Sequence, residues 1–437
     1  EQKERYLPKA ASGEMIFAYS LTEAKHGSDA QHIETEARLD GEFLVLNGAK
    51  TYVTNGNYAG AFTVFCRTGG TDEKPELAAV VVERDAEGLR VGKDIPKMGL
   101  HMSSTSALRF NDVKVPKENL LGEPGQGFKV AMSVLNYGRL GLAAASAGLM
   151  RRSCRDMFDR ATSRTQFGTK IVDFELIREK IARARAHALG TEGIMYFTAR
   201  LLERSPRMNV AIESSHAKLY GTTRCWETLY DAMQVAGGAG YLRTMPYEKR
   251  MRDFRVTTIF EGTTEIHSIY PALTIARGLG ERLGKRGGLG KLLGIVGFRA
   301  GQELRKLEID SGIPGAAEAL RVARRGETIV RRLVARAVRT WRREITQHEF
   351  ALRRITEVNL AVFVVLAALA RLASTAKDGD GVNEEDQRAL AYLVEEAKEL
   401  FRRPLTIEPT ALERETNSLV DVLTSTWKAD AGSEDEE

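Results

Sequence analysis

The chain has 437 residues, which is enough for two to four domains with sizeable hydrophobic cores. Its hydrophobic content of 43% and charged content of 28% are ordinary for a globular protein. The isolated cysteines Cys66, Cys154 and Cys225 lack the paired spacing of zinc, iron–sulfur or disulfide sites, so we expect a reducing compartment and no metal. The formal net charge of +5 is uneven, because residues 282–354 contain 18 Lys and Arg against 7 Asp and Glu.

Residues 1–14 read as the end of a helix entering a turn, and we interpret them as the remnant of an N-terminal helical domain. Residues 15–122 read as β-structure, with alternating apolar residues on both sides of a turn signal at Asp40-Gly41 that predicts a hairpin. Further short runs separated by Gly and Pro favour an antiparallel barrel or sandwich.

From Gly127 the apolar residues follow a helical period, which predicts a long helix towards Thr162. Two more helices are predicted at about 175–203 and 208–235, and a shorter one near Thr263, so residues 123–280 read as a four-helix bundle. The remainder divides into three parts: a basic, glycine-rich linker or membrane-contact segment at 281–325, a second helical domain at 326–427, and an acidic tail at 428–437. The predicted fold class is therefore α+β, multidomain and mostly α. The longest apolar run, Leu360–Ala370, is too short to span a bilayer, which takes about 20 residues.

The stretch from Met251 to Tyr270, MRDFRVTTIFEGTTEIHSIY, places a single acid, Glu261, between an apolar run and a glycine at a helix start. A carboxylate in such a setting can act as a desolvated general base, because burial raises its pKa towards the working pH. The same residues also fit a capping box, in which Thr258 and Glu261 only close a helix N-terminus. The residues alone leave both interpretations open.

The segment MRDFRVTTIFEGTTEI closely resembles the catalytic segment of the acyl-CoA dehydrogenase family. In that family the Glu before Gly-Thr removes the α-proton of an acyl thioester while the β-hydrogen passes as hydride to FAD. The resemblance implies that Glu261 is the catalytic base, that its N–H and a flavin hydroxyl polarise the thioester oxygen, that Gly262 contacts substrate and that Thr263 contacts FAD.

Two segments of the β region resemble flavin-binding segments of the family. The stretch AYSLTEAKHGSD at 18–29 is similar to the signature Y-x-x-T-E-x-x-x-G-S-D. The resemblance implies that Tyr19, Leu21 and Thr22 line the isoalloxazine and that Ser28 reaches the FAD pyrophosphate or the bound thioester. The stretch NGAKTYVTNG at 47–56 is similar to N-G-x-K-x-W-I-T-N-G. It implies that Thr54 bonds the flavin near N5 and that Tyr52 stacks where the family has Trp. Without the family, the first stretch reads as a polar loop and the second as a hairpin.

Two further segments resemble contacts to FAD across a dimer. Arg164 and Phe167 belong to RTQFG, which is similar to the family's R-x-x-F-G, and a guanidinium can hold phosphate oxygens bidentately. Gln234, Gly237 and Gly238 belong to QVAGGAG, which matches Q-x-x-G-G-x-G, although such a glycine run often only ends a helix. Glu175 stands where the family has a glutamine, and we assign it no role.

The run Asn136-Tyr-Gly-Arg139 on the first long helix matches a family segment near the catalytic carboxylate. The resemblance implies that Arg139 acts beside the carboxylate and the bound thioester, whereas outside the family it would read as a surface charge. Some branches of the family hold their base at the position of Gly138, which cannot do that work. On this resemblance Glu261 is left as the base.

The C-terminal third resembles the very-long-chain branch of the family, for example at Phe350–Ala373. That resemblance implies a homodimer and peripheral membrane contact through residues 282–306, for which a plain solvated linker is the alternative. The basic region also admits a DNA-binding flavoprotein of the same superfamily, but six arginines spread around a helix with few aromatics nearby make nucleic acid the less favoured partner. Those six are Arg324, Arg331, Arg332, Arg336, Arg339 and Arg343.

The sequence thus predicts a FAD-dependent acyl-CoA dehydrogenase of fatty acid β-oxidation that acts on long or very long chains and passes electrons to an electron-transfer flavoprotein. An acyl-CoA oxidase that passes electrons to oxygen is the alternative. We expect a cytoplasmic or membrane-associated protein in a bacterium, or one on the matrix face of the inner mitochondrial membrane in a eukaryote.

Overall fold

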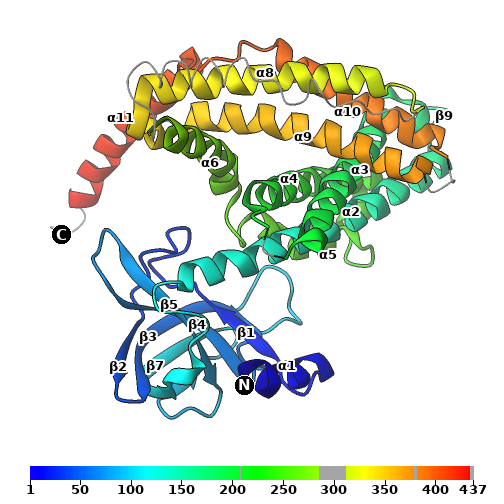
Figure 1. Ribbon diagram of the computed structural model, residues 1–437. Helices are drawn as coiled ribbons and strands as arrows, with labels where there is room; N and C mark the ends of the chain where they lie inside the picture. Colours follow the sequence, from blue (N-terminus) through cyan, green and yellow to red (C-terminus); the bar gives the residue numbers. More distant parts are fainter. Residues whose placement is uncertain (207, 285–311, 378–380, 434–437) are drawn as a thin grey trace. The chain divides into compact units, whose positions relative to one another are not determined.

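The computed structural model describes residues 1–206, 208–284, 312–377 and 381–433 (Figure 1). Its contacts group the chain into two compact units. Unit 1 comprises Glu1–Arg139 and Gly237–Thr263, and unit 2 comprises Leu140–Ala236 and Thr264–Glu437. The long helix α2 (Gly127–Ser163) contributes residues to both. Of the segment predicted to contact a membrane, residues 285–306 lie outside the described residues.

Unit 1 is built on a seven-stranded sheet that follows the short helix α1 (Gln2–Ser12). The strands are β1 (Phe17–Ser20), β2 (Glu36–Asp40), β3 (Phe43–Thr54), β4 (Ala61–Gly70), β5 (Pro75–Glu83), β6 (Leu89–Val91) and β7 (Thr105–Pro116). Their order is β1-β4-β2-β3-β7-β6, with β5 also paired to β4. The predicted hairpin is confirmed, since Asp40 pairs with Phe43 across a turn in which Gly41 has φ +61°.

The sheet is mixed, so the antiparallel pairing predicted for this region holds for most strand pairs but is wrong for β1 and β2 against β4. Both β1 and β2 run parallel to β4, whereas β2–β3, β3–β7, β4–β5 and β6–β7 are antiparallel. Tight turns force antiparallel pairing only between neighbours such as β2 and β3. β1 reaches β4 across more than 40 residues of chain, so no turn restricts its direction.

The core of unit 1 forms because alternate residues of each strand face the same side. Strand β7 shows the pattern clearly: Leu108, Phe110, Val113 and Val115 are buried, and the residues between them are mostly exposed. A second buried cluster packs β4 and β5 against α2, through Phe65, Leu77 and Ala131 among others. This second cluster also contains Leu21, at the start of the loop that leads towards β2.

Unit 2 is helical apart from one small hairpin. After α2 come β8 (Thr165–Gln166), β9 (Thr169–Lys170), α3 (Glu175–Arg204), α4 (Ala211–Ala236), α6 (Thr264–Gly284), α8 (Ala316–Trp341), α9 (Glu349–Lys377), α10 (Glu384–Arg402) and α11 (Ala411–Ser433). The predicted α3, α4 and α6 are confirmed within a few residues. α8 begins at Ala316, inside the range predicted as linker. The predicted α+β, mostly helical class is confirmed.

Helix α9 lies at the centre of unit 2, in contact with α3, α6, α8 and α10 (Figure 1). This placement explains its apolar sequence, because Val358, Val365, Leu369 and other residues on several sides are buried together. Within the described ranges α9 is the one helix long and apolar enough to cross a membrane by length and composition, and about half of its apolar stretch (56%) is buried inside the protein. The run Leu360–Ala370 is thus the middle of a core helix.

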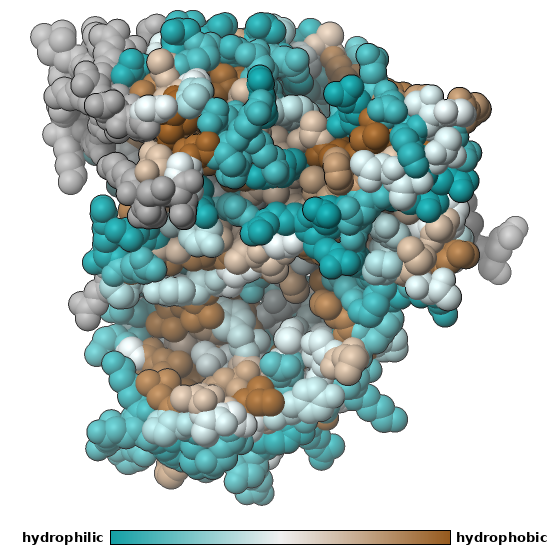
Figure 2. Space-filling view, turned by 90° about the vertical axis from the view of Figure 1, so that its right-hand side faces the viewer, coloured by the Kyte–Doolittle hydropathy of each residue, from teal (hydrophilic) through white to brown (hydrophobic). Residues whose placement is uncertain are grey.

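The two units carry different side chains on the face drawn in Figure 2. On unit 2, hydrophilic side chains cover most of this face. On unit 1, hydrophobic side chains gather at several points. Exposed large hydrophobic residues of unit 1 include Tyr52, Tyr58, Met98 and Met102. Exposed aromatic and apolar groups of this kind are candidates for contact with a ligand or a partner.

Candidate active site

The turn that presents Glu261 is strained. Helix α5 (Tyr247–Phe254) continues into a 3₁₀ turn, η4 (Arg255–Thr258), and the next helix, α6, begins only at Thr264. Between them Glu261 has φ +58° and Gly262 has φ +94°. A left-handed backbone is uncommon for a residue with a side chain and is typical of functional sites. The capping-box interpretation is wrong, because Glu261 precedes α6 and Thr258 ends η4 instead of opening a helix.

The Glu261 carboxylate lies against the backbone of Gly138 in α2. A Cβ atom added at Gly138 would be 2.9 Å from Glu261 Oε2 and 3.0 Å from Oε1. Residue 138 must therefore lack a side chain for the carboxylate to occupy this place. The next residue, Arg139, is buried, and its Nε donates to the backbone oxygen of Glu261 at 3.2 Å. Arg139 thus holds the peptide that carries the acid.

Tyr19 on β1 belongs to the same group of side chains. Its ring packs against Phe65, with the ring centroids 4.9 Å apart, and its hydroxyl lies 3.5 Å from the backbone oxygen of Ala131. Burial raises the pKa of Tyr19 well above its ordinary value, and the Glu261 charge raises it further while Arg139 lowers it. Unit 1 therefore brings Tyr19, Arg139 and Glu261 together, although they are far apart in sequence.

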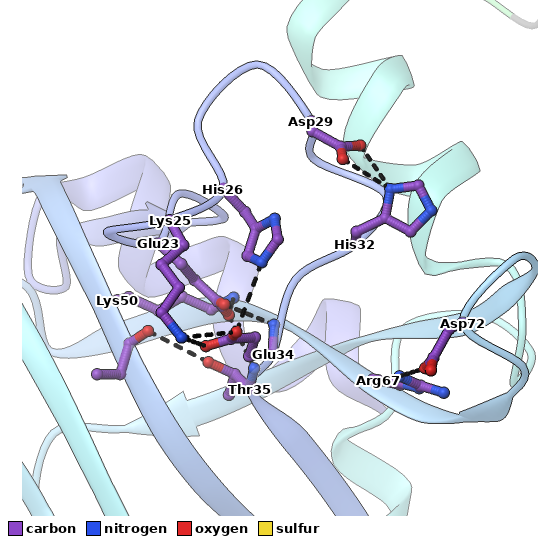
Figure 3. A network of polar contacts seen from close by, with 11 residues as sticks. Glu23, Lys25, His26, Asp29, His32, Glu34, Thr35, Lys50, Arg67 and Asp72 are labelled. Atoms are coloured by element: carbon purple, nitrogen blue, oxygen red, sulfur yellow. Dashed lines mark hydrogen bonds and ion pairs between the residues drawn. The ribbon is translucent and has the colours of Figure 1, made fainter. Parts of the chain in front are cut away.

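A buried ion pair fixes the loop that follows Tyr19 (Figure 3). Lys50 on β3 is completely buried, and its Nζ donates to Glu23 Oε1 at 2.7 Å and to the backbone oxygen of Leu21 at 3.1 Å. The Glu23 carboxylate also accepts from the backbone N–H groups of Glu34 at 2.5 Å and Thr35 at 2.9 Å. Burial works to raise the pKa of Glu23, but Lys50 and these donors outweigh it and hold the pKa below its usual range.

The ion pair brings the two segments with predicted flavin contacts side by side. The N–H of Thr51 donates to the backbone oxygen of Thr22 at 2.9 Å, so the loop after β1 lies along β3. The pairing of β3 with β7 shifts register between Lys50 and Val53, and at this irregularity Tyr52 has φ +55° and a ring that is 65% exposed. Thr54, at the end of β3, is also exposed.

This donor set fits a flat, polar-edged aromatic group such as a flavin. The hydroxyls of Thr22 and Thr54 can bond the edge of a ring, and the exposed Tyr52 ring can stack on its face. The irregularity in β3 is the feature that turns Tyr52 outward, as bulges commonly do next to active sites. The residues present are therefore chemically suited to an isoalloxazine.

The remaining predicted residues of unit 1 lie in different settings. Leu21 is buried in the core, so its side chain positions the loop and does not line a surface. Ser28 is exposed on the loop between β1 and β2. Gly262 and Thr263 are partly exposed in the turn after Glu261. Gly237 and Gly238 are exposed, and Gly237 has φ +65°, which favours glycine.

The predicted dimer contacts in unit 2 are exposed. Arg164 directly precedes the β8–β9 hairpin, and Phe167 at the hairpin tip has φ +50° and is 96% exposed. Its ring contacts Phe174, with the centroids 6.3 Å apart in an edge arrangement. Gln234 lies exposed in the last turn of α4. An arginine, an aromatic ring and an amide on the surface are available to a ligand or a second subunit.

Two site features were not predicted from the residues. The Glu23–Lys50 pair joins positions 27 residues apart, and the signal for it was a Glu and a Lys inside otherwise apolar or hydroxyl-rich segments. Gly138 was noted only as unable to act as a base, whereas the structure gives it the role of making room for Glu261. Within the described part of the chain, no cluster of three or more metal-ligating His, Cys, Asp or Glu side chains is present.

Comparison with known proteins connects this geometry to a family. Residues 18–113 match the model of the acyl-CoA dehydrogenase middle domain, and residues 125–279 match that of the acyl-CoA dehydrogenase C-terminal domain. The human very long-chain specific acyl-CoA dehydrogenase, a mitochondrial protein, is 36% identical over 401 residues, which is 86% of this chain and 60% of that protein. The chain spans 60–65% of the length of the first curated relatives that it matches.

Solved structures agree with the sequence comparison. An acyl-CoA dehydrogenase from Bacillus anthracis, complexed with FAD, has a TM-score of 0.80 at 28% identity and covers 95% of this chain and 74% of that chain. A chain in the structure of the electron transferring flavoprotein of Acidaminococcus fermentans has a TM-score of 0.59 at 34% identity, with 63% of this chain and 72% of that chain covered. On these matches the chain belongs to the acyl-CoA dehydrogenase family.

Proposed function

We propose that this protein uses FAD to dehydrogenate long or very long acyl-CoA to trans-2-enoyl-CoA, with Glu261 as the base. The observation that carries the proposal is the position of the Glu261 carboxylate, on a strained turn and against a glycine that leaves room for it. Arg139 and Tyr19 lie beside it, and the strand and loop that suit a flavin belong to the same unit. Membership of the family supports this assignment.

Glu261 removes the proton from the α-carbon, and its carboxylate becomes a neutral acid. The electron pair of the broken C–H bond forms the α,β double bond as the β-hydrogen leaves with its own electron pair. A bound flavin supplies the acceptor for that hydride. Arg139 fixes the Glu261 peptide through its bond to the carbonyl oxygen, so that the Glu261 N–H is held in place to polarise the thioester oxygen. Gly262, next to the base, lets the substrate approach the backbone closely.

Two groups of residues would hold FAD. In unit 1, Thr22, Thr54 and Tyr52 would contact the flavin ring, Ser28 the pyrophosphate or the thioester, and Thr263 the cofactor near the base. Leu21 would position the flavin-binding loop, because its backbone oxygen accepts a hydrogen bond from Lys50. Arg164, Phe167, Gln234, Gly237 and Gly238 would contact the FAD of a second subunit, which makes the functional protein a homodimer.

The chain-length class and the electron acceptor follow from the relatives. The very long-chain specific human protein matches along 86% of the chain, which supports a long acyl substrate and a role in fatty acid β-oxidation. The similarity to a chain in an electron transferring flavoprotein structure supports a flavoprotein as acceptor. The relatives named mitochondrial support a mitochondrial location in a eukaryotic source.

An anaerobic titration of the flavin-loaded protein with palmitoyl-CoA and octanoyl-CoA tests the proposal. We expect both to bleach the flavin absorbance, with palmitoyl-CoA effective at the lower concentration. Glu261→Gln is expected to keep its yellow flavin but not to bleach. Glu265→Gln, an equal change of charge at an exposed position in α6, is the control and should bleach like the original protein. A Glu261→Gln protein that bleaches at the original rate would refute the base, and rapid peroxide formation in air would identify an oxidase instead.

A further inference from the structure

A pocket in unit 2, between α8 and the end of α10, has an unusual lining. It has a volume of about 470 Å³ and contains the side chains of three arginines, Arg325, Arg332 and Arg403. Its other walls are mostly apolar, and among the described residues none that lines it is acidic. Ile329, Leu333 and Leu405 supply much of the apolar surface. None of these residues belongs to the proposed dehydrogenase site.

The geometry of α8 places two of the arginines on one face. Arg325 and Arg332 are seven residues apart, which is two helical turns or about 10.5 Å along the axis. Ile329 lies between them, so an apolar patch separates two cationic ends. The opposite face of α8 is fixed in the core through Ala323, Val330 and Val334. The helix therefore presents this face from a rigid support.

One arginine is held by the neighbouring helix. Arg325 Nη2 donates to the backbone oxygen of Phe401, in the last turn of α10, at 3.3 Å. A cation at a helix C-terminus is favourable, because the unpaired carbonyl groups there carry partial negative charge. Arg403 follows directly after the end of α10 and lines the other side of the pocket. The arrangement of the three cations is therefore set by two helices.

The other two arginines differ from their neighbours in lacking a side-chain partner among the described residues. In α8, Arg331 pairs with Glu327 at 2.8 Å, and Arg336 pairs with Glu408 at 2.9 Å. By contrast, the side chains of Arg332 and Arg403 have no hydrogen bond or ion pair with the part of the chain that the structure describes. Like charges that line one pocket without an acid among the described lining residues repel one another, so an anion that enters the pocket is favoured.

We infer that this pocket binds a phosphate monoester attached to a short apolar group. Planar guanidinium groups match phosphate oxygens with paired hydrogen bonds, and several of them can surround one dianion. The apolar walls would take the attached carbon chain, and the volume is in the range of small-molecule sites. Such a group can come from a dissolved phosphate ester or from the headgroup of an anionic phospholipid.

Duplex DNA, the partner considered for this basic region, fits the structure less well. Of the six arginines weighed for DNA binding, Arg331 and Arg336 are paired with acids, and Arg332 lines the pocket. DNA binding depends on many phosphate contacts and falls steeply with salt. A pocket of three arginines predicts one saturable site for a small ligand.

Calorimetric titration with hexyl phosphate tests the inference on the complete protein. The pocket variant is the double substitution Arg332→Gln and Arg403→Gln. The control is Arg339→Gln with Arg402→Gln, which makes the same change in net charge at exposed residues of the same two helices outside the pocket lining. We expect saturable binding to the original protein, at least tenfold weaker binding to the pocket variant, and binding within twofold of the original for the control. Circular dichroism verifies that both variants are folded.

Vesicles distinguish the two sources of the phosphate group. The original protein and both double variants are sedimented with vesicles of phosphatidic acid in phosphatidylcholine. If the pocket variant alone loses vesicle binding, the lipid headgroup is the source; if all three bind vesicles equally and only hexyl phosphate binding is lost, the ligand is a dissolved ester. The inference is overturned if the original protein shows no saturable binding of hexyl phosphate, or if the pocket and control variants weaken it equally.

Discussion

The loop at Glu23 and the turn at Glu261 lie in the same unit and use a carboxylate in opposite ways. Glu23 is buried, has an ordinary backbone conformation and accepts hydrogen bonds from Lys50 and two backbone N–H groups. Glu261 is partly exposed, has a left-handed backbone and lies against a glycine. In the first region the surrounding groups saturate the charge. In the second the lack of a side chain at Gly138 makes room for the carboxylate.

The difference shows how one unit can hold a cofactor loop rigidly and still present a reactive acid. A saturated, buried ion pair is expensive to disturb, because each partner would be left as a buried charge without compensation. A strained turn costs free energy that contacts elsewhere in the fold offset. Its unusual backbone orients the side chain towards the reacting atoms. Substitutions in the two regions should therefore affect different measurements.

The largest expected effect on stability is at Lys50. Lys50→Met leaves the Glu23 carboxylate buried without its cation, so we expect the free energy of unfolding to fall by about 3–5 kcal/mol. Urea unfolding followed by circular dichroism measures this change. The double variant with Glu23→Gln removes both charges and should recover part of the loss.

Lys25 provides the matched control in the same loop. Its Nζ pairs with Glu34 Oε1 at 3.1 Å, but both side chains are more than half exposed. An exposed pair is usually worth less than about 1 kcal/mol, so Lys25→Met should change the unfolding free energy by no more than that. Equal losses at Lys50 and Lys25 would contradict the structural role given to the buried pair.

The next largest effect is expected for Gly138→Ala, which should lower activity without lowering stability. An added methyl group would come within 2.9 Å of the Glu261 carboxylate, which would have to move. We expect Gly138→Ala to lower kcat/KM for palmitoyl-CoA roughly 100-fold, since displacing a catalytic group by about 1 Å can cost that much. Thermal unfolding should show a Tm that is unchanged or higher, because Ala favours a helix over Gly by about 1 kcal/mol.

Gly141 is the control for this substitution. It lies one turn further along α2, and a Cβ added there meets no atom within 4 Å. Gly141→Ala should therefore give the same helix stabilisation with unchanged kcat/KM. If both alanine variants retain full activity, the close approach of Gly138 does not position the base.

Buried titratable groups should also differ in how their contribution to the free energy of unfolding changes with pH. His216 in α4 is buried, and its Nε2 lies 2.7 Å from Asn359 Nδ2, but its Nδ1 has no hydrogen-bond partner among the described residues. Burial lowers the pKa of His216 from 6.5 to about 3. The unfolded chain therefore binds a proton below pH 6.5 that the folded protein does not, and stability falls as the pH falls. Glu23, whose pKa is lowered from 4.5, loses its contribution only at a lower pH.

This comparison predicts that His216→Gln reduces acid sensitivity. Between pH 7 and pH 5 the original protein should lose about 2 kcal/mol of unfolding free energy through His216 alone, and the variant should lose that much less. Urea unfolding at both pH values measures the difference. Lys25→Met, which removes an exposed pair, should leave the slope in this pH range unchanged. Identical slopes for the His216 variant and the original protein would contradict the burial argument.

The sequence predicted what local patterns determine. The helices α3, α4 and α6 follow from apolar periodicity and the Ser205-Pro206 break, and the β2–β3 hairpin follows from Asp40-Gly41. The parallel pairing of β1 with β4 depends on residues more than 40 positions apart and leaves no local signal. The Glu23–Lys50 pair, 27 positions apart, left only the unusual placement of a Glu and a Lys as a signal. The approach of Gly138 to Glu261 across 123 positions left none. These features form only when segments that are distant in the sequence pack together in the folded protein.

The central claim, that Glu261 takes the α-proton, can be measured without the hydride step. Palmitoyl-CoA is incubated anaerobically in D₂O with protein whose flavin has already been reduced, and deuterium at the α-carbon is followed by mass spectrometry. We predict exchange with the original protein and with Glu265→Gln, and none above the buffer rate with Glu261→Gln. Exchange at the original rate in Glu261→Gln would show that another group is the base.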